Sequence, residues 1–258
     1  MKFNELANKM KKLEEKNDIA IPKDSYIICR LDGRGFSKLT KEILPIDKPF
    51  DPCFAEDMVN TVNHVMQCGF DVIFGYVQSD EISLLLSFGD NTFNRRLSKI
   101  TSVLSGEASS FLTLELLHKV SFDCRVSELS SREEVVDYFL WRRSDSQRNC
   151  IQGYCYWKLI EQGYSGKRGQ RVIKNLSYED KINFLKTANI DYHTVPNQYK
   201  YGTGLYNRYF LKEAFNPKTE QKVICTRKEI QINNDLSNTE KFTDLLFEII
   251  SEDRLKNI

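Results

Sequence analysis

The sequence has 258 residues, of which 41% are hydrophobic and 12% aromatic, and its formal net charge is +1. This composition supports a large core and excludes a disordered chain or a globally basic one, so nucleic-acid binding would require local patches. We expect neither a signal peptide nor a membrane span, because no apolar run is long enough. Seven cysteines without a CxxC pair indicate reduced core cysteines in a cytoplasmic protein.

The first half of the chain alternates between strand-like and helix-like patterns. Short apolar, β-branched runs bounded by turn residues predict strands, and apolar residues at helical spacing predict helices. Asp51 and Pro52 supply an N-cap and a first helical residue. The predicted strands are residues 25–31, 71–77, 82–88 and 120–129. The predicted helices are residues 51–69 and 92–118, with an amphipathic helix expected over residues 1–16.

The resulting order is β-α-β-β-α-β, which is typical of the ferredoxin-like split βαβ fold of the α+β class. In this fold both helices lie on one face of an antiparallel sheet. The same arrangement forms the palm of polymerases and nucleotidyl cyclases. Residues 1–130 are therefore predicted to form a palm-like catalytic core that carries the N-terminal helix.

Residues 131–258 are predicted to form a more helical extension, packed on that core and in contact with RNA and nucleotide. Ser131 and Glu134 fit a capping box that opens a long helix, expected to end near Gln162. The remaining predicted elements are a cationic loop at residues 163–175, a short helix that opens at Ser177, a strand at residues 222–232 and a terminal helix.

Three carboxylates are expected to meet at one edge of the predicted sheet. Asp32 ends the first strand, and Asp80 and Glu81 lie in the QSDE turn between the second and third strands. Such a cluster is costly unless a cation neutralises it, and two Mg²⁺ ions would do so while organising phosphoryl transfer. The alternative interpretation is that both segments are ordinary solvated turns.

Two segments, RLDGRGFSKLT and GYVQSDEISLLL, resemble the signature pair of the tRNA-histidine guanylyltransferase superfamily, and most closely its bacterial and archaeal guanylyltransferase-like branch. NRRLSKITSVLSGEAS, FDCRV, VVDYFLWR and DSQRNCIQGYCYW follow in the family's order. The resemblance implies nucleotide addition in the 3′-to-5′ direction to the 5′ end of tRNA. ATP would activate the 5′-phosphate, and the 3′-hydroxyl of GTP or another template-matched nucleotide would attack it.

The resemblance also implies roles for individual residues. Asp32 and Asp80 would be metal ligands assisted by the Gly33 carbonyl, and Glu81 a further ligand or an outer partner. The expected contacts to nucleotide or phosphate are Gly33, Arg34, Gly35, Phe36, Ser37, Ser79, Arg96, Lys99 and Asn149. The expected contacts to RNA are Arg148 and Lys181 from the resemblance, and Arg95, Lys167, Arg168 and Arg171 from local clusters of positive charge. For the last three, a mobile surface loop without a role in binding is the alternative.

The sequence departs from the family pattern at Ser37 and Gln147, where histidines are expected, and at Gly153, where an asparagine is expected. These departures favour general, template-directed repair of tRNA 5′ ends over strict addition of G to histidine tRNA. The resemblance suggests a homo-tetramer. Two other functions remain open at this point, a nucleotidyl cyclase that acts on nucleotide alone and a non-catalytic RNA-binding module.

Overall fold

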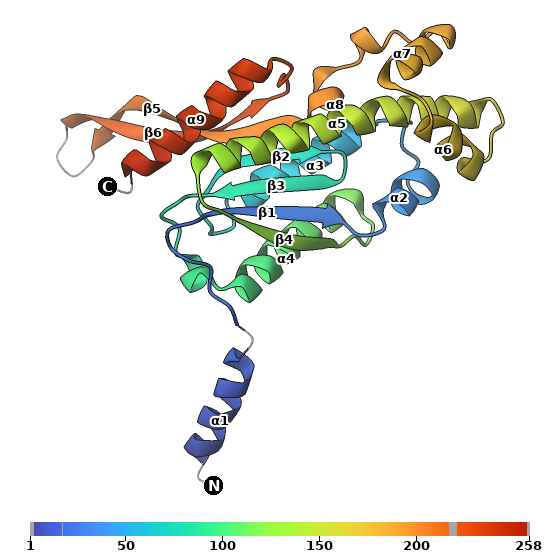
Figure 1. Cartoon of the computed structure of the whole chain (residues 1–258). Coiled ribbons are helices and arrows are strands. Elements are labelled where there is room, and N and C mark those ends of the chain that lie inside the picture. Colours follow the sequence, from blue (N-terminus) through green and yellow to red (C-terminus); the bar gives the residue numbers. More distant parts are fainter. Residues whose placement is uncertain (1–2, 17, 217–220, 257–258) are drawn as a thin grey trace.

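An antiparallel sheet forms the centre of the computed structural model, which describes residues 3–16, 18–216 and 221–256 (Figure 1). Within these residues six strands pair in the order β4-β1-β3-β2-β5-β6. The strands are β1 (Tyr26–Gly33), β2 (Val72–Gln78), β3 (Glu81–Leu86), β4 (Phe122–Leu129), β5 (Thr203–Asn216) and β6 (Gln221–Asn233). The predicted antiparallel sheet and its four strands in the first half are confirmed.

Helices cover both faces of this sheet (Figure 1). The α-helices in the described residues are α1 (Phe3–Glu15), α2 (Phe36–Lys38), α3 (Pro52–Val65), α4 (Leu97–Leu116), α5 (Arg132–Glu161), α6 (Gly166–Lys174), α7 (Tyr178–Thr187), α8 (Asn197–Tyr201) and α9 (Thr239–Lys256). No buried residue belongs to α1, which projects from the body, and the first two residues of the predicted N-terminal helix lie outside the described ranges. Across the described part of the chain, no helix is both long and apolar enough to cross a membrane.

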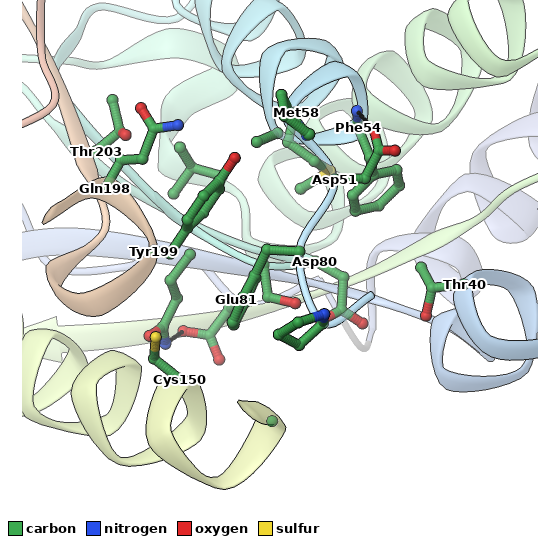
Figure 2. A pocket seen from close by; sticks show the side chains of 18 of the residues that line it. Thr40, Asp51, Phe54, Met58, Asp80, Glu81, Cys150, Gln198, Tyr199 and Thr203 are labelled. Carbon is green, nitrogen blue, oxygen red and sulfur yellow. Dashed lines mark hydrogen bonds between the residues drawn. The ribbon is translucent and has the colours of Figure 1, made fainter. Parts of the chain in front are cut away.

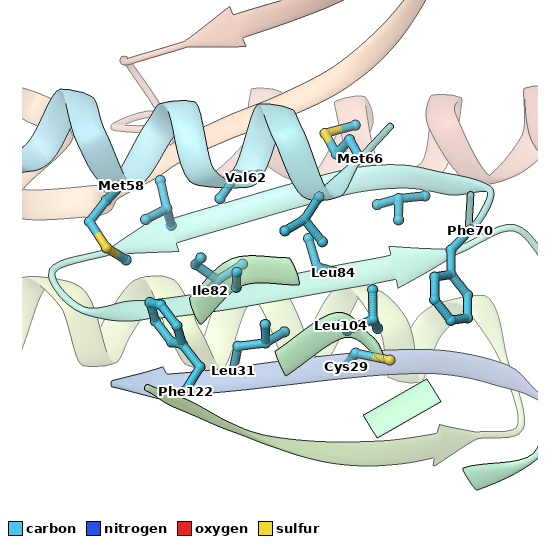
Figure 3. Packing of buried hydrophobic residues seen from close by; sticks show 14 of the residues in the cluster. Cys29, Leu31, Met58, Val62, Met66, Phe70, Ile82, Leu84, Leu104 and Phe122 are labelled. Carbon is cyan, nitrogen blue, oxygen red and sulfur yellow. The ribbon is translucent and has the colours of Figure 1, made fainter. Parts of the chain in front are cut away.

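Helices α3 and α4 pack on one face of the sheet (Figure 3). The α3 helix begins where the sequence predicts, because the Asp51 carboxylate accepts a hydrogen bond of 2.8 Å from the Phe54 backbone N–H. Its fully buried Met58 and Val62 meet alternate strand residues such as Leu84. Each such side chain contributes roughly 1.5–3 kcal/mol through burial, so this layer anchors the strands.

Helices α5 and α9 pack on the opposite face (Figure 1). Ser131 caps α5 by accepting a hydrogen bond of 3.1 Å from the Glu134 backbone N–H. Phe139 on α5 is fully buried, and its ring meets that of Phe74 at 4.9 Å and 89°, an edge-to-face contact. The sheet is therefore buried on both sides, and α5 lies directly over the ends of β1 and β3 that carry the predicted carboxylates.

The structure corrects two predictions for the second half of the chain. The expected cationic loop is largely helix α6, whose Gly166 and Gly169 allow close packing on Tyr156 and Leu159 of α5. The sequence does not predict strand β5, because Pro196, Gly202 and Gly204 are typical of a break in regular structure. It pairs with β2 and β6, so strands from both halves of the chain share one sheet.

Candidate active site

A row of three acidic residues crosses the end of the sheet. Asp32 on β1 lies opposite Glu81 on β3 and opposite Asp123 on β4. Side chains directly opposite one another point to the same face, and like charges in such positions destabilise a sheet. The outer two have arginine partners: Arg125 Nε lies 3.5 Å from Asp123 Oδ1, and Glu81 is paired as described below. Within the described residues Asp32 makes no ion pair.

Asp80 lies beside Asp32 at the tip of the β2–β3 hairpin. The Gly33 backbone N–H donates a hydrogen bond of 3.1 Å to the Asp80 carbonyl, which joins the hairpin to the end of β1. Burial raises the pKa of the Asp80 carboxyl, and the charge of Asp32 raises it further. A side chain at Gly33 would place its Cβ 2.5 Å from the Phe36 ring, so this close approach requires glycine.

Glu81 faces arginines rather than its acidic neighbours. Arg142 Nε on α5 lies 2.8 Å from Glu81 Oε1, and Arg30 Nη1 lies 4.0 Å from Oε2. The Gln78 side-chain amide donates a hydrogen bond of 3.1 Å to Oε1. Burial raises the pKa of Glu81, while Arg142 opposes that rise. The geometry favours the outer-partner role among the two roles predicted for Glu81.

Asp32 and Asp80 fit a magnesium site. Among the described residues no group of three or more histidine, cysteine or acidic side chains could hold a metal ion. Magnesium needs no such cage, because one or two carboxylates complete its octahedron together with phosphate oxygens and water. Burial raises the pKa of Asp80 most and repulsion by Asp32 adds to the rise, and a bound cation would relieve that repulsion. Asp32, Asp80 and the neighbouring Gly33 carbonyl are therefore the residues that would hold the ion.

A cavity of about 820 Å³ opens beside these carboxylates (Figure 2). This volume lies in the range of nucleotide-sized ligand sites. Its polar lining includes Asp32, Lys41, Lys48, Gln78, Ser79, Asp80, Glu81, Ser146 and Asn149. Its apolar wall includes Pro49, Phe50, Trp157 and Tyr199, and the Phe50 and Tyr199 rings stack at 5.1 Å and 13°. A ligand with a charged end and a flat apolar end matches this division.

The predicted nucleotide contacts near the DGRG turn are only partly supported. Ser37, Ser79 and Asn149 line the cavity. Gly35 adopts a left-handed backbone (φ 76°) in front of α2, and Arg34 is exposed. Phe36 is 1% exposed, because its ring packs in the core against two other phenylalanines, so the nucleotide contact predicted for this residue is left to its backbone.

The cations around the start of α4 lie near the start of β1, at the end of the sheet opposite the carboxylates. Arg95 is 3% exposed and donates a hydrogen bond of 2.6 Å to the Ser25 carbonyl, so it cannot contact RNA. Ser25 precedes β1, whereas Asp32 lies near its other end, about 20 Å away at strand geometry. Arg96 pairs with Asp18 at 3.0 Å. Neither Arg96 nor Lys99, one turn further along, lines the cavity beside the carboxylates.

The RNA contacts predicted on the helical extension include both exposed and buried cations. Lys167, Arg168 and Arg171 are exposed on α6. Arg148 is also exposed and forms an ion pair with Asp145 of its own helix. Lys181 is 9% exposed, because α7 packs that side against α5, and its predicted RNA contact is not available in this arrangement.

Sequence reasoning missed Arg142, Asp145 and the aromatic wall of the cavity. Helical spacing carries a signal for the first: residue 142 falls on the same face as the buried Val135 and Phe139, so a charge there must be buried too. No comparable signal marks Phe50 and Tyr199, because their positions are 149 residues apart in the sequence and meet only in the fold.

Comparisons with known proteins agree with this fold. The family model described as tRNAHis guanylyltransferase matches residues 7–130, and the model of the Thg1 C-terminal domain matches residues 133–251. These matches place the chain among the nucleotidyltransferases. It belongs to the tRNAHis guanylyltransferase family.

Individual relatives show the same relationship. A probable tRNA(His) guanylyltransferase of Bos taurus is 32% identical over 202 residues, covering 74% of this chain and 67% of its own length. tRNA(His) guanylyltransferase 1 of Arabidopsis thaliana is 28% identical over 209 residues, and the match covers 77% of this chain but only 36% of that protein. Solved structures of a bacterial tRNA(HIS) guanylyltransferase (Thg1)-like protein, in complex with ATP or with GTP, share the fold. Their TM-scores are 0.71 and 0.70 at 23% identity, over 95% of this chain and 99% of theirs.

Proposed function

We propose that the chain adds nucleotides in the 3′-to-5′ direction to the 5′ end of tRNA, with Mg²⁺, ATP and GTP or another nucleoside triphosphate. The observation that carries this proposal is the pairing of Asp32 with Asp80 at the polar wall of a nucleotide-sized cavity. Family membership supplies the class of reaction, and the ATP and GTP complexes of similar proteins support both nucleotides as substrates.

The proposed site uses the first four strands as a polymerase-type palm. The order β4-β1-β3-β2, with α3 and α4 packed on one face, agrees with the ferredoxin-like arrangement. A bound pair of Mg²⁺ ions would activate the attacking hydroxyl and stabilise the leaving phosphate. Asp32 and Asp80 hold and orient the ions in this proposal, while the aromatic wall takes the flat base. Asn149 and Ser79 line the cavity and would orient the sugar and phosphates.

The test is incorporation of labelled GTP into a tRNA that lacks its first 5′ nucleotide. We expect incorporation only with ATP or a 5′-triphosphate end, and its complete loss when EDTA removes divalent cations. A product formed from nucleotide without RNA would instead indicate a cyclase. If neither product forms while the protein still binds RNA, the non-catalytic alternative holds.

Selection of the incoming nucleotide provides a second prediction. At Gly153, where the family pattern has asparagine, a Cβ would lie 3.6 Å from Pro49 and 3.7 Å from the Phe50 ring, so a larger side chain would narrow the cavity. We expect addition to follow the base opposite the 5′ end, with U, C, A or G added to match. Sequencing the products from tRNAs with four different template bases checks this. Addition of G opposite every base would contradict it.

Helix α6 is proposed to bind the tRNA backbone. Its exposed cations Lys167, Arg168 and Arg171 give one face three positive charges. Replacing all three by alanine should weaken tRNA binding about tenfold at 0.15 M salt and reduce the slope of log affinity against log salt by roughly two. Filter binding across a salt series measures both.

The matched control replaces three exposed cations at the far end of the sheet, Lys212, Lys222 and Lys228. The same net charge is lost there, so this variant should keep the wild-type salt slope. An equal fall in both variants would mean that net charge, not α6, sets the affinity.

We also propose that the protein is a cytoplasmic homo-oligomer. The cysteines in the described residues are all free thiols, as expected in a reducing compartment. The β5–β6 ribbon exposes large apolar side chains, with Leu211 73% and Ile224 70% exposed, and self-association would cover them. Light scattering on the purified chain gives the oligomeric state.

A further inference from the structure

A row of ion pairs, centred on a buried arginine, lies next to the carboxylates of the site. Arg142 is 4% exposed and stands between two acids, Glu81 at 2.8 Å and Asp145 at 2.6 Å. The acids themselves are 14% and 16% exposed. Asp145 also pairs with the exposed Arg148 and accepts a hydrogen bond of 3.3 Å from the Asn149 side chain. These ion pairs thus connect the hairpin turn to the surface of α5.

Stability alone is a poor reason for such an arrangement. Taking several charges out of water costs free energy that their mutual attraction often fails to recover, and apolar replacements are frequently as stable. Arg142 lies on the face of α5 that elsewhere packs apolar residues such as Val135 and Phe139 against the sheet. A buried arginine at this position therefore points to a role in the neighbouring site.

The contacts of Glu81 show what Arg142 does. Glu81 follows Asp80 in the chain and lies opposite Asp32 across the strand pair, so a free carboxylate here would be within reach of the same cation. Its Oε1 instead forms an ion pair with Arg142 and accepts a hydrogen bond from the Gln78 amide, and its Oε2 lies 4.0 Å from Arg30 Nη1. Each carboxylate oxygen of Glu81 therefore forms an ion pair with an arginine side chain.

We propose that Arg142 is a positioning residue that holds Glu81 away from the metal ions, and that Asp145 fixes Arg142 for this task. The inference rests on the proposed metal site at Asp32 and Asp80. Magnesium has six coordination positions, so a third carboxylate would occupy one that phosphate needs and would add a negative charge that repels the triphosphate. Arg142 keeps the site at two carboxylates.

The test is Mn²⁺ binding to the nucleotide-free protein, measured by electron paramagnetic resonance with melting curves for every variant. Asp80→Asn should weaken binding at least about tenfold, since a charged ligand is lost. Glu81→Gln should leave the affinity within about twofold of wild type, because Glu81 does not touch the ion. Arg142→Gln should tighten Mn²⁺ binding about tenfold by freeing Glu81, and the double variant Arg142→Gln/Glu81→Gln should return to the wild-type affinity.

These results separate positioning from simple structural support, which predicts that Arg142→Gln weakens Mn²⁺ binding. Arg142→Lys keeps the charge but lacks the planar fork, so it should restore most of the wild-type affinity. The proposal is wrong if Glu81→Gln weakens Mn²⁺ binding as much as Asp80→Asn, a result that decides the question even if Arg142→Gln does not fold. If Asp80→Asn and Asp32→Asn both bind Mn²⁺ like wild type, the proposed metal site itself is wrong.

Discussion

Replacing Asp80 by asparagine should lower the rate of nucleotide addition by roughly a thousandfold or more, because the ion that it holds supplies several kcal/mol of transition-state stabilisation. Asparagine preserves the shape of the side chain and removes only its charge. Single-turnover incorporation of labelled GTP at saturating Mg²⁺ measures the loss. An activity within tenfold of wild type would contradict the metal role of Asp80.

The same variant should fold at least as well as wild type. Burial and the charge of Asp32 raise the pKa of Asp80, so above that pKa the folded chain holds a charge that it disfavours relative to the unfolded chain. Removing the charge should therefore leave the melting temperature at pH 7 unchanged or higher. Asp123→Asn is the matched control: Asp123 also lies opposite another acid but is exposed and paired with Arg125, and its loss should alter the rate less than tenfold.

Replacing Phe139 by alanine should cost about 4 kcal/mol of folding free energy, since a fully buried ring is exchanged for a cavity. The ring fills the space between α5 and the sheet and contacts Phe74 edge to face. In a chain of this size such a loss lowers the melting temperature by roughly 10 °C. Urea unfolding followed by circular dichroism gives the free energy.

Loss of this contact should also disturb the site, because α5 carries Arg142 and Asn149 one and three turns further along. We expect weaker GTP binding in Phe139→Ala even at temperatures where the variant is folded. Leu114→Ala on α4 is the control, since that side chain is 71% exposed and its removal should cost less than about 0.5 kcal/mol. Equal losses in the two variants would contradict the packing described for α5.

Local patterns were sufficient to predict the first half of the fold. Asp51 and Pro52 mark the start of α3, and alternating apolar residues mark β1 and β3. The convergence of Asp32 with Asp80 followed from topology, because in the predicted order the first strand lies next to the central hairpin.

Other features depend on contacts that no local pattern carries. Arg95 and Arg96 are adjacent and chemically equivalent in sequence, yet one is buried against the Ser25 carbonyl and the other faces Asp18. Gly166 and Gly169 lower helix propensity, but packing on α5 outweighs that cost. Lys181 is buried because that side of α7 packs against α5, a contact that the sequence around Lys181 does not indicate.

The pairing of β5 with β2 determines how the chain can be divided. Residues 203–206 complete the hydrogen bonds of residues 74–77, and α5 and α9 cover the face behind them. A fragment that stopped at residue 130 would leave β2 as an open edge above an uncovered apolar surface, the combination that favours aggregation. The boundary between the two family models near residue 131 is therefore a poor place to truncate the protein for expression.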